Sequence, residues 1–305
     1  MLKLQGICPI VATPFDADGR VDGASFERLC HTLAAGGCHG LTLFGIAGEY
    51  YKLTDAERAE LLGRLVDVCR SRGVPSIVSV TDQATEVAVE TARRYQAAGA
   101  DSLMLLPPFF LKPSAAAVEA HVRAVGAAVD IPVMLQYAPE QTGVAIPPET
   151  LAGIANDLPT VRDMKIECKP AGHYISRLLE LTDGAVRVHV GNAGFNMIET
   201  FRRGAVGVMP GCSMFDVYLD IDAALRTGDL PRALDTHTAL LALLNHIRQN
   251  VEMIIAFEKH ILMRRGVIAS DHCRLPGYAL DAEDRALFEV LYERIEPRLR
   301  RLEVV

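Results

Sequence analysis

The sequence of 305 residues lacks the features of a nucleic-acid-binding or membrane protein. It has 31 basic against 38 acidic residues, a formal net charge of −7, whereas proteins that bind phosphate backbones have a basic excess. No stretch reaches the roughly 18 uncharged apolar residues that a membrane helix needs. The amino-terminal segment meets Pro14 and Asp16 too early for a secretory signal. We therefore expect neither a nucleic-acid nor a membrane partner.

Residue patterns that bind metals and nucleotides are also missing. The seven cysteines are odd in number and scattered, and no Cys-x-x-Cys pair occurs. This usage is typical of reduced thiols in a cytoplasmic protein rather than of disulfides or a zinc site. No Gly-x-Gly-x-x-Gly or phosphate-binding loop appears, so we expect no cofactor and no metal.

The chain does contain eight short apolar runs, spaced about 20 to 35 residues apart. Most are nearly continuous rather than alternating, as is typical of strands covered on both faces. Between them, apolar residues recur every three or four positions, which predicts helices at 55–72, 85–98 and 114–129. This alternation predicts a (β/α)8 barrel, also called a TIM barrel. The predicted strands are 8–13, 40–44, 76–81, 102–106, 132–136, 161–165, 186–190 and 205–209.

Strand-like runs stop after residue 214, and only helical segments follow. They cover 217–227, 230–265 with a possible break, and 282–300, and Gly266 is expected to end the second. We therefore predict a barrel over residues 1–214 and a C-terminal helical extension over residues 215–305 that packs on the barrel.

Active sites of such barrels lie at the carboxyl ends of the strands. Lys165 ends the sixth predicted strand, in a chain with only six lysines. Burial favours the neutral amine, which can attack a ketone and form a Schiff base. The alternative is a solvated lysine that merely closes a strand.

Two further segments follow strands of the same barrel. Gly45-Ile46-Ala47-Gly48-Glu49 follows the second strand, and its two glycines suit amides that converge on a carboxylate. The alternative is a tight turn that needs glycine for its geometry. Gln136 and Tyr137 follow the fifth strand, where a phenol can relay protons, although the nearby Pro139 and Gly143 can simply build a turn.

These motifs together resemble the dihydrodipicolinate synthase and N-acetylneuraminate lyase family over nearly the whole chain. The matching segments are Thr13-Pro14-Phe15, Gly45-x-x-Gly48-Glu49, Pro107-Pro108-Phe109-Phe110, Pro139-x-x-Thr142-Gly143, Lys165, and Lys259 to Arg274-Leu275-Pro276. The resemblance implies a barrel with a C-terminal helical extension, assembled as a homodimer or homotetramer. It also implies that Lys165 forms an imine with pyruvate or another 2-keto acid.

The sequence departs from the family where protons are transferred. The resemblance places a tyrosine–threonine–tyrosine relay at Gln136, Ile46 and Phe110, none of which can titrate. Tyr137 is one place further along its strand and should face the other way. The arginine that binds the second substrate in the synthase corresponds to Gln141.

We therefore expect a Schiff-base lyase, either an aldolase or a dehydratase, that acts on a 2-keto acid through Lys165. Gln136 would orient the substrate, and proton transfer would fall to Glu49, Tyr137, water or the substrate carboxylate. Two alternatives remain open: a dihydrodipicolinate synthase with a rerouted relay, and a catalytically silent barrel that binds keto acids. The substrate-binding residues expected are Ile46, Ala47, Gly48, Glu49, Phe110 and Met209.

Overall fold

The computed structural model describes residues 2–302 and divides into two compact units. The first comprises Met1–Gly6 and Pro75–Met209, and the second comprises Ile7–Val74 and Pro210–Val305. The second unit is therefore built from two stretches that lie far apart in the sequence.

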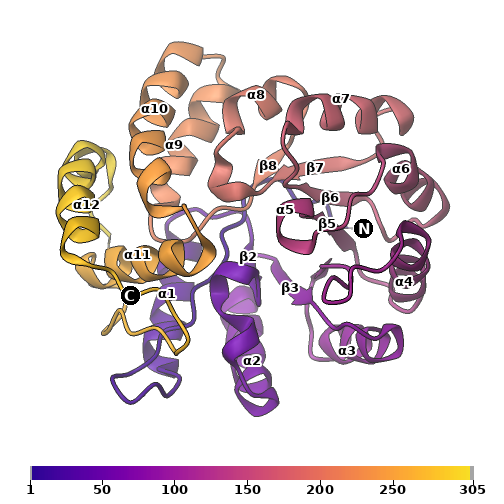
Figure 1. The fold of residues 1–305 in the computed structure, drawn as a ribbon, viewed down its shortest axis with the longest axis horizontal. Helices are drawn as coiled ribbons and strands as arrows, with labels where there is room; N and C mark the ends of the chain where they lie inside the picture. The colour runs from indigo at the N-terminus through magenta and orange to yellow at the C-terminus, as the bar shows by residue number, and fades with distance from the viewer. Residues whose placement is uncertain (1, 303–305) are drawn as a thin grey trace. The chain divides into compact units, whose positions relative to one another are not determined.

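In the first unit, strands and helices alternate, and strands β3 to β8 lie in one parallel sheet in consecutive order. The strands from β3 to β6 are buried at every position, which explains why their sequences are nearly continuous in apolar residues. Helices α3, α4, α6 and α7 run along the outside of these strands (Figure 1). The elements are β3 (Ser76–Val80), α3 (Thr85–Ala97), β4 (Ser102–Leu105), α4 (Ala115–Ala127), β5 (Val133–Tyr137), α5 (Pro139–Thr142), α6 (Pro148–Asp157), β6 (Asp163–Ile166), α7 (Ala171–Leu181), β7 (Arg187–Val190), η3 (Asn192–Gly194), α8 (Met197–Arg202) and β8 (Gly207–Val208).

The amino-terminal part of the second unit holds one strand and two long helices. Thr54 and Glu57 form a capping box at the start of α2, and Gly73 ends this helix in the left-handed conformation, with φ at +66°. Ile10 forms isolated parallel bridges with Thr42 and with Gly211. The elements are α1 (Gly23–Ala35), β2 (Leu41–Leu43), η1 (Ile46–Gly48), η2 (Tyr50–Lys52) and α2 (Asp55–Arg72).

The carboxy-terminal part of the second unit is helical. Helix α10 packs against both α9 and α12 (Figure 1). The break predicted in the long helix is real, because Asn250 accepts a hydrogen bond from the amide of Met253 and so begins a new helix. The elements are α9 (Phe215–Arg226), α10 (Leu230–Ile247), α11 (Val251–Arg264), α12 (Ala282–Ile295) and η4 (Glu296–Arg298).

The first predicted strand was wrong, whereas the other seven match observed strands within two residues at each end. Strand β1 is only Gly6–Ile7, and within 8–13 only Ile10 forms bridges. Pro9 has no N–H to donate, so a regular ladder cannot run through this apolar run. The last helix also stops earlier than predicted, at Ile295, before Pro297. The two compact units follow other boundaries than residue 214, and that domain boundary stays a prediction.

Candidate active site

Three polar side chains lie next to one another on one face of the first unit's sheet. Lys165 of β6 is the register partner of Gln136 in β5 and of His189 in β7. Partner residues in neighbouring parallel strands direct their side chains to the same face. Lys165 is only 4% exposed, Gln136 is 3% exposed and His189 is fully buried. The lysine is therefore not the solvated strand end that the sequence left open.

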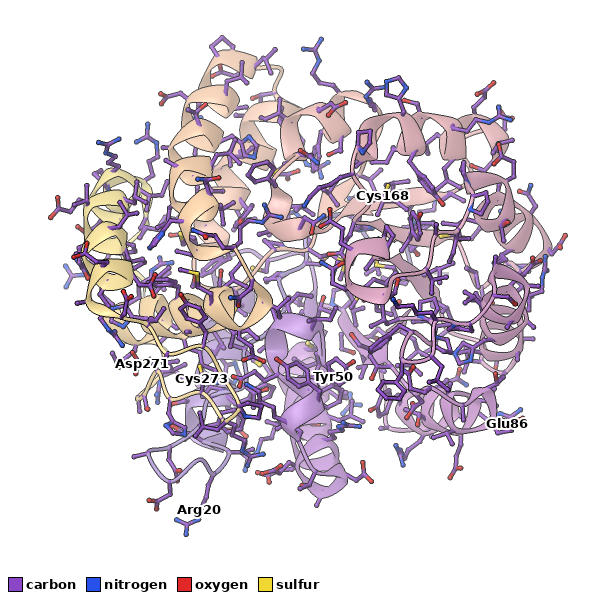
Figure 2. The ribbon with its side chains drawn as sticks, viewed as in Figure 1. Arg20, Tyr50, Glu86, Cys168, Asp271 and Cys273 are labelled. Carbon is purple, nitrogen blue, oxygen red and sulfur yellow. The ribbon has the colours of Figure 1, made fainter. Side chains whose placement is uncertain are left out.

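Glu167 is the residue that connects this group. It lies between Ile166, the last residue of β6, and Cys168, which is labelled in Figure 2. One carboxylate oxygen, Oε1, lies 3.5 Å from the Lys165 Nζ. The other, Oε2, accepts a hydrogen bond of 2.6 Å from the Gln136 Nε2. Glu167 is itself 8% exposed, so a carboxylate is held beside the amine with little water around it.

The loop after β7 fixes the other side of Glu167. The Asn192 amide donates to its Oε1 at 3.1 Å, and the Asn192 side chain donates to its carbonyl oxygen at 2.8 Å. Asn192, Ala193 and Gly194 all have positive φ, at 51°, 53° and 68°, a conformation that costs non-glycine residues about 1–3 kcal/mol each. An ideal Cβ on Gly191 would lie 2.1 Å from the Glu167 Oε1, so a residue with no side chain makes room for the carboxylate.

Sequence reasoning missed Glu167 because it placed the end of the strand at Lys165. A usable signal was present, since side chains two residues apart along an extended chain face the same way. With the strand continued by one residue, the alternating positions Asp163, Lys165 and Glu167 share one face. That spacing alone would have predicted a carboxylate beside the amine.

A second polar pair, Asp163 and Arg187, lies two residues before Lys165 and its partner His189, on the same face. Both carboxylate oxygens of Asp163 accept hydrogen bonds from Arg187, at 2.8 Å from Nε and 2.6 Å from Nη2. Burial nevertheless raises the pKa of Asp163. Burial, and then the positive charges of Arg187 and Lys165, lower the pKa of His189 to about 3, so its imidazole is neutral.

Tyr137 lies on the opposite face from Gln136, as strand alternation predicted. Its ring stacks on Tyr174 with centroids 4.8 Å apart, and its hydroxyl accepts a hydrogen bond of 3.3 Å from the Ile146 amide. Burial raises the pKa of Tyr137. The structure therefore gives the Tyr137 phenol a packing environment away from Lys165, and our proposal below does not use it.

The other candidates of the first unit differ in exposure. Phe110 is 78% exposed, and its amide, like that of Phe109, donates to the Gln83 Oε1. Met209 is buried, and its amide donates to the Val190 carbonyl at 2.9 Å. Neither residue supplies a polar group to Lys165, so their expected roles in substrate binding stay predictions.

The glycine turn after β2 belongs to the second unit. Neighbouring atoms leave no room for a side chain at either of its two glycines. An ideal Cβ would lie 2.7 Å from Ile10 at Gly45 and 2.9 Å from the Val11 carbonyl oxygen at Gly48. The Gly48 amide donates to the Gly45 carbonyl at 2.8 Å. The amide expected to bind a carboxylate at Gly48 is therefore used within the turn. The first amides of such a turn, here those of Ile46 and Ala47, have no acceptor inside it.

Glu49, which ends this turn, is not a free carboxylate. It is fully buried, and its two oxygens pair with Lys259 and, at 3.0 Å, with Lys52. Both oxygens of Glu49 are engaged in ion pairs, so the structure does not favour Glu49 as the shuttle. No cluster of His, Cys, Asp and Glu suited to a metal ion occurs within residues 2–302. Nor does this part of the chain contain a helix long and apolar enough to cross a membrane.

Comparison with known proteins agrees with this architecture. Residues 3–294 match the model of the dihydrodipicolinate synthetase family. L-2-keto-3-deoxyarabonate dehydratase of Azospirillum brasilense is 31% identical over 302 residues, which cover 97% of this chain and 96% of that protein. 4-Hydroxy-tetrahydrodipicolinate synthase of Salinibacter ruber is 31% identical over 242 residues, or 79% of each chain. The crystal structure of dihydrodipicolinate synthase from Rhodopseudomonas palustris matches with a TM-score of 0.88 at 28% identity, over 95% of this chain and 97% of that one.

The fold class is thus a (β/α)8 barrel with a C-terminal helical extension, and the prediction of this fold is confirmed. The chain belongs to the dihydrodipicolinate synthetase family. The prediction of a Schiff-base lyase of the class I aldolase type is confirmed at the level of this family.

Proposed function

We propose that the protein is a dehydratase that removes water from a 2-keto-3-deoxy sugar acid bound to Lys165 as an imine. The observation that carries the proposal is the buried Glu167 carboxylate, 3.5 Å from the Lys165 amine. It supplies a titratable group where Gln136, Ile46 and Phe110 cannot. The dehydratase of Azospirillum brasilense, which matches nearly the whole chain, supports the same reaction class.

The chemistry needs few groups. The Lys165 amine adds to the keto carbon and, with one proton taken up from solvent and given back at the final hydrolysis, releases one water, which leaves a protonated imine. The Glu167 carboxylate takes a proton from C3, and the electron pair moves into an enamine. The enamine then expels the C4 hydroxyl, which leaves as water with the proton that Glu167 returns. A final water hydrolyses the unsaturated imine and frees Lys165.

One carboxylate is sufficient for this elimination, because it accepts the proton and then donates it. Gln136 and Asn192 hold the carboxylate from two sides and so fix its direction. The expected roles of Ile46, Ala47, Phe110 and Met209 in substrate binding stay predictions. Aldol cleavage of the same imine would also need one base, for the C4 hydroxyl, so the preference for dehydration rests on the similarity to the dehydratase of Azospirillum brasilense.

The first test is reductive trapping. The protein is incubated with pyruvate and borohydride, and the modified residue is located by mass spectrometry. We expect one pyruvyl adduct on Lys165, none in Lys165→Met, and an unchanged adduct in Lys169→Met, which removes a half-exposed lysine paired with Glu140. An unlabelled Lys165 in the native protein would contradict the proposal.

The second test identifies the reaction. With a 2-keto-3-deoxy pentonate, we expect a product lighter by one water and no released pyruvate. Pyruvate release would indicate an aldolase instead. Condensation of pyruvate with aspartate semialdehyde would indicate the synthase, and trapping without any turnover would indicate a silent keto-acid-binding barrel.

Assembly and location are proposals of the same kind. We propose a homodimer or homotetramer in the cytoplasm, on the basis of the family resemblance and the cysteine usage. The prediction that residues 215–305 pack as an extension on a barrel of residues 1–214 stands with them. Sedimentation analysis of the purified protein tests the assembly.

A further inference from the structure

We propose that His189 is a positioning residue that holds a buried water molecule beside Lys165, and that this water hydrolyses the imine. The inference rests on the proposed function, because it needs an imine on Lys165. Both residues belong to the first unit, which comprises Met1–Gly6 and Pro75–Met209. Their side chains share one face of the sheet, because they are register partners in the neighbouring strands β7 and β6.

The imidazole of His189 has no protein partner. His189 is fully buried, and neither of its ring nitrogens has a hydrogen-bond partner among residues 2–302. The large majority of buried polar side chains are hydrogen-bonded, either to protein or to ordered water. The low pKa of His189 keeps its ring neutral, so one nitrogen is a donor and the other an acceptor. A water molecule can satisfy the ring in either tautomer, because water both donates and accepts.

The position of the ring shows where one of the two nitrogens is directed. An ideal Cβ on Gly207, the register partner of His189 in β8, would lie 2.7 Å from the His189 Cδ2. The Cδ2 edge of the ring therefore lies over β8, where a residue with no side chain makes room for it. Nδ1 is on the opposite edge of an imidazole, and β7 separates β8 from β6 in the sheet (Figure 1). The Nδ1 edge is thus directed towards β6, the strand of Lys165.

Lys165 has hydrogen-bond donors for the same water. Its ammonium form has three N–H donors, and its one ion-pair partner in the described part of the chain is Glu167, at 3.5 Å. Lys165 is only 4% exposed, so bulk water does not complete its hydrogen bonds. The nearby Asp163 and Arg187 bind each other. A water between His189 and Lys165 satisfies an incompletely bonded group on each side, and a buried water needs about two to four such partners.

Hydrolysis of the imine consumes one water beside the Lys165 nitrogen. The water oxygen adds to C2, and an electron pair of the C=N bond moves to the nitrogen. One water proton passes to Glu167, which returns it to the nitrogen. The C–N bond then breaks, the keto group forms, and the second water proton leaves to solvent as Lys165 becomes a free amine. Imine formation is the reverse of these steps, so the same site receives the water that it releases.

The test measures exchange of the keto oxygen of pyruvate with water enriched in ¹⁸O. Each cycle of imine formation and hydrolysis replaces this oxygen once, and mass spectrometry measures the labelled pyruvate above the uncatalysed exchange. In His189→Leu we expect the exchange rate to fall about 10-fold to 100-fold, the size of effect that a misplaced reactant produces. The amount of pyruvate trapped by a borohydride pulse at saturation should stay within about twofold of the native amount, because help in the transition state does not change an equilibrium.

A polar variant separates this role from simple packing. His189→Asn places an amide near the former Nδ1, and we expect exchange within about threefold of the native rate, because the amide can bind the same water. If His189 only filled space, leucine would be the milder change, since asparagine is smaller and leaves a cavity. If His189→Leu does not fold, His189→Met serves as the apolar variant.

The matched control is His121→Leu. His121 is a second buried histidine of the first unit, on α4, and its Nδ1 lies 3.0 Å from the Thr85 Oγ1. We expect this variant to exchange oxygen and trap pyruvate as the native protein does. A crystal structure of the native protein provides an independent check, in which we expect a water within hydrogen-bond distance of the His189 Nδ1.

The outcomes separate the two proposals. Native exchange in His189→Leu, a larger loss in His189→Asn than in His189→Leu, or a crystal structure without a water at Nδ1 would overturn the role of His189 and leave the proposed function intact. Failure of the native protein to trap pyruvate would overturn the proposed function, and the role of His189 with it.

Discussion

Two buried lysine–glutamate pairs in this protein have opposite properties. Lys165 lies 3.5 Å from Glu167, longer than an ordinary charged hydrogen bond, and Glu167 is its one ion-pair partner among residues 2–302. Lys259 pairs closely with Glu49 and has a carbonyl and an aromatic ring as additional partners. Both lysines are almost inaccessible to water.

The difference shows which of the two amines can react. The Lys259 nitrogen is surrounded by Glu49, the His272 carbonyl and the Phe15 ring, so these partners stand between it and a ketone. Lys165 has donors to spare, and the carboxylate beside it is bound on its far side by Gln136. Burial of a lysine therefore does not by itself identify a Schiff-base residue. The number of contacts that its nitrogen makes distinguishes a reactive amine from a structural one.

The largest effect is expected when the Glu167 carboxylate beside Lys165 is neutralised. In Glu167→Gln we expect dehydration to slow by about 10²- to 10⁴-fold, the usual contribution of a general acid–base group, while trapping of pyruvate on Lys165 persists. Steady-state rates and trapping yields measured on one preparation check both. Glu140→Gln, which removes an exposed carboxylate paired with Lys169, is the control. Equal rates in Glu167→Gln and the native protein would exclude Glu167 from proton transfer.

The second prediction concerns stability, for which we expect Lys259 to matter more than Lys165. Lys259→Met leaves the buried Glu49 without its closest partner and should lower the free energy of unfolding by about 3–5 kcal/mol. Lys165→Met leaves Glu167 bound to Gln136 and Asn192, so we expect a change within about 1 kcal/mol. Urea denaturation of the three proteins at one pH measures both values. Similar losses in the two variants would remove the distinction between a structural and a reactive lysine.

The third prediction concerns His189, the neutral neighbour of Lys165. Its pKa of about 3 lies below the ordinary value of 6.5, so the unfolded chain takes up a proton first as the pH falls. The stability that His189 contributes is complete above pH 6.5 and is lost on acidification towards pH 3, by about 1.4 kcal/mol per pH unit. His189→Leu should therefore flatten the dependence of unfolding free energy on pH between 6.5 and 4.5, a window that lies inside these two values. Parallel curves for the two proteins would show that His189 does not titrate in this way.

The sequence was sufficient to predict the fold class because most strands are covered on both faces. Continuous apolar runs such as 76–81 and 102–106 mark such strands directly, and caps such as Thr54 and Gly73 mark the ends of helices. The prediction failed at 8–13, where the composition is right for a strand but Pro9 interrupts hydrogen bonding. Apolar composition indicates that a segment is buried. Whether the segment also forms a strand depends on the hydrogen bonds of each backbone N–H.

The candidate site was only half predictable. Lys165 and Gln136 follow from strand ends and family resemblance, and the register of β5 and β6 places them side by side. Glu167 did not follow, because its position depends on one more extended residue in β6 and on the strained loop around Asn192. The engagement of Glu49 also could not be inferred, since its partner Lys259 lies about 210 positions away in the chain.

That separation has a consequence for how the protein is made. The first unit is almost one continuous stretch, Pro75–Met209, whereas the second needs Ile7–Val74 and the segment that begins at Pro210. At a synthesis rate of about 5–20 residues per second, Glu49 leaves the ribosome roughly 10 to 40 seconds before Lys259. During that time Glu49 has no partner from α11. The C-terminal helices of the second unit, which would accompany α1 and α2, have not yet been synthesised. All residues of the first unit have been synthesised once Met209 is added, whereas the second unit can be completed only after synthesis has passed α11.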